Sequence, residues 1–189
     1  MAIGDYSNPT WTPGETLTAA KMQLITNKIL ELDSFDKKRA ILKKSANQSC
    51  VSDATVNDDN TFNITLVANK IYEIELNLKV GGVTAADFKC AWVKGAGITM
   101  TDRICVGPSS GVASIIDTNA TFMTRAYNDE AGYGTEDTYF SSIREKFLVY
   151  TSASNNTLKL QWAQASSTAN NTTVYADSYM KITEVIAWA

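Results

Sequence analysis

The chain has 189 residues, of which 44% are hydrophobic and 20% are charged, and its formal net charge is -3. This length fits one domain with an extension. The acidic balance argues against a nucleic-acid binder whose affinity rests on phosphate contacts. The chain contains no histidine, which excludes Ser-His-Asp and Cys-His nucleophile chemistry and histidine zinc sites.

Residues 1–17 are predicted to form an extended arm. Pro9 and Pro13 restrict the backbone on both sides of Trp11, because each proline fixes its own conformation and that of the residue before it. Trp11 either folds back on the following segment or fills a pocket of a partner, a role in which tryptophan is favoured. The first residues do not resemble a signal peptide, and no apolar run is long enough to span a membrane, so we expect cytosolic synthesis.

Residues 18–36 are predicted to form one short helix. Thr18 is a good N-cap, and the helix has apolar residues with the 3-4-3 spacing of a heptad seam. These residues are Met22, Ile25, Ile29 and Leu32. Two heptads are too short for a stable coiled coil alone. The stripe therefore either packs on the chain's own domain or joins a short helical bundle between subunits.

Residues 37–189 are predicted to form an antiparallel, jelly-roll-like β-sandwich. The chain holds 22 Thr, 15 Ser and 14 Asn, and these residues favour strands and the turns between them. Alternation of apolar and polar residues marks the clearest strands, which lie at 62–66, 72–80, 158–162 and 180–186. Further strand candidates lie at 40–46, 48–53, 87–93, 112–116, 121–127 and 145–151.

Three polar segments are predicted to connect the strands. Residues 57–60 form a turn in which Asp58 and Asp59 are either solvated or bind a cation. Residues 128–144 form a long loop, and residues 170–173 form a second polar segment outside the strands. Exposed aromatic candidates are Tyr133, Tyr139 and Phe140; with acidic neighbours they fit a subunit interface, or a cation or carbohydrate site that could include Trp162.

No enzyme, metal or cofactor motif is recognised in the sequence. The three cysteines, Cys50, Cys90 and Cys105, are widely spaced and form no redox or metal motif. We expect them to be small buried residues in a reducing compartment, with one disulfide and one free thiol as the alternative. A hydrolase using two carboxylates of the 128–144 loop is a third class of function, but nothing in the sequence places two carboxylates against each other.

Two N-terminal motifs are similar to those of a known group of proteins. They are TWTPGE at residues 10–15 and LTAAKM at residues 17–22. They resemble the opening of many tailed-bacteriophage structural proteins, in which such a sequence precedes a short helix and a β domain. Gln23 departs from that pattern, where asparagine is commoner. Later motifs of this chain recur in the same order in such proteins. They lie at residues 44–49, 57–59, 68–72, 87–92 and 160–164.

The resemblance implies a non-enzymatic virion protein, often a homotrimer with a jelly-roll-like domain. We expect a capsid decoration or head-fibre protein, made in the host bacterium and carried on the capsid surface. Its partners would be itself and the major capsid protein or another virion protein. Capsid-anchoring candidates are Pro9, Trp11, Pro13 and Leu17. The alternative is a minor tail or tail-fibre protein that binds a host receptor or glycan through loops 128–144 and 166–174.

Overall fold

The computed structural model describes residues 18, 20, 22–23, 39–110 and 120–185. Among the first of these, residues 20, 22 and 23 are helical, and the Met22 amide donates to the Thr18 carbonyl at 3.0 Å. This i to i−4 bond is the one that the carbonyl of an N-cap residue accepts. Apart from Met22, the predicted helix stripe (Ile25, Ile29 and Leu32) and the whole predicted arm lie outside the described residues.

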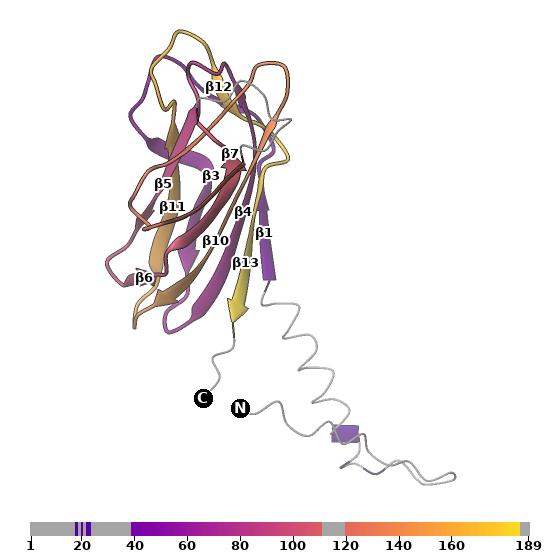
Figure 1. The fold of residues 1–189 in the computed structure, drawn as a ribbon. Coiled ribbons are helices and arrows are strands. Elements are labelled where there is room, and N and C mark those ends of the chain that lie inside the picture. Colours follow the sequence, from indigo (N-terminus) through magenta and orange to yellow (C-terminus); the bar gives the residue numbers. More distant parts are fainter. Residues whose placement is uncertain (1–17, 19, 21, 24–38, 111–119, 186–189) are drawn as a thin grey trace.

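The rest of the described chain is almost entirely β-structure, which confirms the predicted fold class. Figure 1 labels most of the strands. The strands are β1 (Arg39–Lys43), β2 (Gln48–Cys50), β3 (Asn57–Leu66), β4 (Ile71–Gly82), β5 (Phe88–Lys94), β6 (Ile98–Met100), β7 (Arg103–Pro108), β8 (Ala120–Arg125), β9 (Ala131–Tyr133), β10 (Ser141–Thr151), β11 (Asn156–Ala163), β12 (Thr172–Val174) and β13 (Tyr179–Val185).

Two antiparallel sheets pack face to face (Figure 1). The larger sheet has the order β1-β13-β4-β10-β7-β8, and the smaller has the order β3-β11-β5-β9. Eight of the strands can be renumbered one to eight in chain order, and the sheet orders then become 1-8-3-6 and 2-7-4-5. These eight are β1, β3, β4, β5, β9, β10, β11 and β13. This is the jelly-roll pattern, in which consecutive strands alternate between the sheets except for the fourth and fifth, β5 and β9, which pair with each other. The strands β6 to β8 are an insertion that extends the larger sheet past β10.

Alternating side chains of β4 and β10 fill one side of the core. In β4 the inward residues Ile74, Leu76 and Leu78 are at most 2% exposed, whereas Glu73 and Glu75 face solvent. The β10 strand pairs with β4 along its length, so its own inward residues meet the same core. The predicted strand at 72–80, with one apolar face and one solvent-exposed face, is therefore confirmed. The burial of these apolar groups provides free energy that holds the two sheets together.

Three predicted connections are wrong. Residues 57–60 are the first part of β3, where Lys44 and Lys159 from other parts of the chain pair with its two carboxylates. The 128–144 segment contains β9 and the start of β10, and the polar 170–173 stretch runs into β12, which is buried between β2 and β4. The predicted strand at 112–116 and the last residue of the 180–186 pattern lie outside the described residues.

Candidate interaction surface

The structure separates the predicted exposed aromatic residues. Tyr139 and Phe140 are 55% and 52% exposed, as predicted. Tyr133 is fully buried, and the proposed sugar-stacking Trp162 is 3% exposed, so both predictions are wrong. Tyr133 faces inward because β9 pairs with β5. Gly107 makes room for its ring, since a Cβ atom there would lie 2.7 Å from it.

A buried ion pair occupies the centre of the sandwich. Arg103 on β7 and Glu145 on β10 are 0% and 1% exposed, and their charged groups lie 2.8 Å apart. The Glu145 carboxylate also accepts hydrogen bonds from the Trp92 indole at 2.8 Å and the Tyr133 hydroxyl at 2.8 Å. A buried carboxylate with this many donors is well compensated for lost hydration. The alternation along β10 places Glu145 at an inward position, and this alternation is visible in the sequence.

The remaining partners of this pair close it off from solvent. The Arg103 guanidinium donates to the backbone carbonyls of Ala126 and Asp129, which ties the start of the 128–144 segment to the core. The two thiols of Cys90 and Cys105 lie 3.3 and 3.6 Å from the same Glu145 oxygen. The polar groups of this cluster are therefore directed at one another and bind the two sheets.

Burial controls the ionisation of the groups around Glu145. It raises the pKa of the Tyr133 phenol and of the Cys90 thiol far above their ordinary values, and the negative charge of Glu145 adds to both effects. Burial also raises the pKa of Cys105 to about 11. All three groups therefore stay neutral near pH 7, where a neutral group is the less costly one to bury.

We expect native protein at pH 8 to react with thiol reagents at one of its three cysteines. All three are free thiols, but Cys90 and Cys105 are buried with raised pKa values, and only the thiolate is nucleophilic. Cys50 is half-buried and reacts first. Counting labelled thiols by mass spectrometry tests this, with Cys50→Ser as the control that should label at none. Equal labelling of all three in native protein would contradict the buried cluster.

A second buried ion pair links the two sheets near β1. Lys44 follows β1 and is 1% exposed, and its Nζ lies 2.8 and 3.0 Å from the two carboxylate oxygens of Asp59 on β3. The Trp162 indole donates to the same carboxylate at 3.0 Å. The neighbouring Asp58 accepts from Lys159 at 2.7 Å. The predicted turn is therefore wrong, and Asp59 is buried against Lys44 instead of being solvated or binding a cation. Asp58 is exposed, as predicted, and pairs with Lys159.

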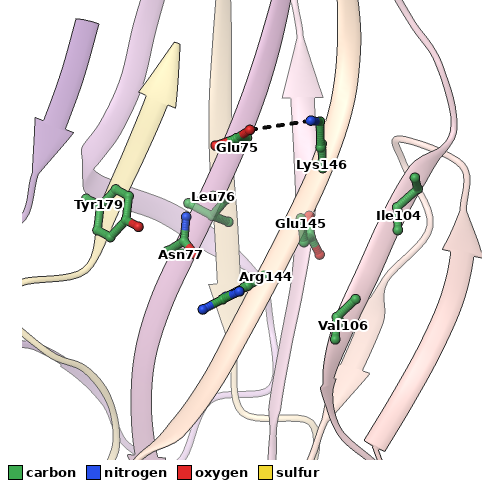
Figure 2. A pocket seen from close by; sticks show the side chains of 9 residues that line it. All are labelled: Glu75, Leu76, Asn77, Ile104, Val106, Arg144, Glu145, Lys146 and Tyr179. Atoms are coloured by element: carbon green, nitrogen blue, oxygen red, sulfur yellow. Dashed lines mark hydrogen bonds and ion pairs between the residues drawn. The ribbon is translucent and has the colours of Figure 1, made fainter. Parts of the chain in front are cut away.

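The outer face of the larger sheet has an open depression of about 420 Å³. It crosses β13, β4, β10 and β7, and Figure 2 shows Arg144 between Asn77 on β4 and Val106 on β7. Tyr179 lies beyond Asn77, and Ile104 beside Val106. In the described part of the chain Arg144 has no hydrogen bond or ion pair. The depression therefore combines an aromatic ring, an amide, apolar side chains and an unneutralised cation.

Two lysines of this outer face, Lys146 and Lys181, are neutralised within it. Lys146 lies 2.9 Å from Glu73 and 3.4 Å from Glu75, and Lys181 lies 3.1 Å from Glu75. The last contact is the largest cause of the lowered pKa of Glu75. The positive charge available to a partner at the depression is therefore that of Arg144.

Apolar side chains extend the outer face on both sides of the depression. Phe122 on β8 is 78% exposed, and Ile104 is 45% exposed. At the other end, the Phe140 and Tyr175 rings meet edge to face at 4.7 Å, and the Lys79 ammonium lies 3.9 Å from the Phe140 ring centre. We call this face, from Phe122 across Arg144 to Phe140, the outer-sheet surface. Exposed apolar area interrupted by charge is typical of surfaces that bind other proteins.

Two acidic residues near the start of the 128–144 segment contact basic residues of the sandwich. Glu130 lies 2.9 Å from Lys89, and Asp129 uses its backbone carbonyl to hold Arg103. Among the described residues there is no group of three Asp, Glu or Cys side chains able to hold a metal ion. No described helix is long and apolar enough to cross a membrane.

Comparisons with known proteins add little to this picture. No family model and no curated protein matches the chain. The tripod (BppUct-A-L) from the baseplate of bacteriophage Tuc2009 aligns with 96% of this chain and 76% of its own, at 11% identity and a TM-score of 0.33. A lipoprotein of Bacteroides thetaiotaomicron aligns with 79% of this chain and 90% of its own, at 9% identity and a TM-score of 0.19.

A third solved structure, from the infectious bursal disease virus Gt strain, aligns with 78% of this chain and 40% of its own, at 10% identity and a TM-score of 0.20. Scores this low do not establish a shared fold with any of the three. No function is transferred from them.

Proposed function

We propose that the chain is a non-enzymatic structural protein of a tailed-bacteriophage virion, and that it forms a homotrimeric decoration or head-fibre protein on the capsid. The phage assignment is supported by the sequence motifs at residues 10–15 and 17–22 and by the order in which the later motifs follow them. The jelly-roll sandwich agrees with the β domain that the resemblance implies.

The observation that carries the proposal is the outer-sheet surface. It presents Phe122, Ile104 and an unpaired Arg144 to solvent, whereas the buried charges Arg103, Glu145, Lys44 and Asp59 are paired inside the sandwich. The chemistry left to the outside of the domain is that of docking. A neighbouring subunit or capsid protein that covers this face would bury apolar area and neutralise Arg144.

The N-terminal residues would supply attachment and assembly. An extended N-terminal arm would bind the major capsid protein, because an extended segment contacts a large area for its length. Its anchoring residues would be Pro9, Trp11, Pro13 and Leu17. Met22, described as 50% exposed, would join Ile25, Ile29 and Leu32 in a helical bundle around the three-fold axis. Three arms on one trimer would strengthen weak individual attachments through effective concentration.

A double substitution on the outer-sheet surface tests the docking role. Phe122→Ser with Arg144→Glu should lower the binding of the purified protein to phage particles at least tenfold, because it removes apolar area and reverses the unpaired charge. Its melting temperature should stay within a few degrees of wild type, since both side chains are exposed. A control pair on the smaller sheet, Val93→Ser with Lys159→Met, should bind normally. Unchanged binding by the first variant would refute this role.

Tyr139 and Phe140 support a second candidate, a tail protein that binds a host receptor or glycan. Both rings are exposed, and the Phe140 ring lies beside Tyr175 and Lys79. Exposed aromatic faces can stack on sugars. Tyr133 and Trp162 no longer belong to this alternative because both are buried. Glycan binding that is lost in Tyr139→Ala would favour it over the decoration role.

A further inference from the structure

The Lys44 side chain has the surroundings of a reacting amine as well as those of an ion pair. Its Nζ lies 2.6 Å from the side-chain oxygen of Asn60, in addition to the two Asp59 oxygens at 2.8 and 3.0 Å. The Phe62 ring lies beneath it, with its centre 5.5 Å away. A buried primary amine thus meets a carboxylate and a carboxamide in one place.

The distances bring the amine close to the amide carbon. An amide C=O bond is about 1.23 Å long, so Nζ of Lys44 lies at most about 3.8 Å from Cγ of Asn60, close to the separation from which nucleophiles attack. The Thr61 hydroxyl donates to the same Asn60 oxygen at 3.0 Å. This donor would stabilise the negative charge that develops on the oxygen when the carbon is attacked.

We propose that Lys44 and Asn60 form an intramolecular isopeptide bond, with Asp59 as the proton carrier. The Lys44 ammonium gives one proton to Asp59, and the free amine attacks Cγ of Asn60, so that a C–N bond forms and the carbonyl electrons move to the oxygen. The carbonyl then re-forms as the bond from Cγ to the Asn60 nitrogen breaks. That nitrogen takes up the protons released by Lys44 and leaves as ammonium, and Asp59 is again a carboxylate.

Asn60 is favoured over the other groups near the amine. Gln48 offers a second carboxamide, but its oxygen is farther from Nζ, at 2.9 Å, and its second partner is the Asn60 backbone amide. Asp59 is a poor electrophile as a carboxylate that accepts from the amine, the Trp162 indole and two backbone amides. Asn60 is exposed, which gives the released ammonia a path to solvent.

The bond would strengthen the point where the predicted arm joins the domain. Lys44 directly follows β1 of the larger sheet, and Asn60 lies in β3 of the smaller sheet. A covalent link here would join the two sheets at the strand through which the N-terminal residues enter. A cross-link that closes a chain segment also constrains the unfolded state. The bond does not depend on the proposed virion role.

Intact mass spectrometry of the purified full-length chain tests the bond. Wild type should be about 17 Da lighter than its sequence, the mass of one ammonia, and trypsin should fail to cut after Lys44. Asn60→Ala should have its full sequence mass, and this variant should fold because the side chain is exposed. Asn63→Ala, an exposed asparagine of the same strand, should still show the loss.

Three outcomes would overturn the proposal. The first is a wild-type mass equal to the sequence mass, with normal cleavage after Lys44. The second is a loss that persists in Asn60→Ala. The third is fragmentation that places the cross-link on Gln48 or Asp59, the latter with loss of water instead of ammonia.

Discussion

Replacing Arg103 with methionine is expected to lower the free energy of unfolding by about 3–5 kcal/mol, because the substitution leaves the buried charge of Glu145 without its cation. The ion pair is fully buried, with its charged groups 2.8 Å apart. The backbone carbonyls of Ala126 and Asp129 lose their donor as well. Urea unfolding followed by tryptophan fluorescence measures this change in the free energy of unfolding. The buried Trp92 is a suitable reporter because its indole donates a hydrogen bond to the same Glu145 carboxylate.

A surface pair of similar length provides the matched control. Lys159 and Asp58 lie 2.7 Å apart with side chains that are 33% and 43% exposed. Lys159→Met should cost only about 0–1 kcal/mol, because solvent screens exposed pairs. If Arg103→Met cost no more than this control, the buried pair of Arg103 and Glu145 would not stabilise the sandwich.

Removing residues 1–17 is expected to abolish attachment to phage capsids while the domain stays folded. The proposal places Trp11 and the two flanking prolines in the contact with the major capsid protein, and an interface often loses most of its affinity when its anchoring tryptophan is removed. The described sandwich begins at Arg39, so the deletion does not enter its core. Co-sedimentation with particles and a melting curve measure the two effects.

A single substitution makes this experiment sharper. Trp11→Ala should weaken attachment by at least tenfold, whereas Trp162→Phe should leave attachment unchanged, since Trp162 is buried in the sandwich. Full binding by the truncated protein would remove the anchoring role from residues 1–17 and leave the outer-sheet surface as the attachment site.

Much of the sandwich could be predicted because long strands reveal their alternation. Residues 72–80 and 158–162 each present one apolar face, and both became central strands, β4 and β11. The three-residue strands β6, β9 and β12 are too short for alternation to be visible in the sequence. Their pairing is decided by neighbouring strands, which a sequence pattern does not contain.

The errors at the predicted sites have one physical cause. Asp59 and Tyr133 were assigned to solvent because their sequence neighbours are polar, but both are buried. In the fold, Asp59 finds Lys44 and Tyr133 finds Glu145, which are partners distant in sequence. A polar residue with a buried partner leaves little local signal. The two exceptions are Lys44, in a mostly apolar strand region, and Glu145, at an inward position of β10.

Purified virions, fractionated on a density gradient and labelled with an antibody to this chain, show whether the protein is a trimer carried on the capsid. We expect the protein to sediment with intact particles and the label to cover the head, while protein released from particles sediments as a trimer. A chain that stays in the soluble fraction as a monomer, with unlabelled particles, would contradict this expectation.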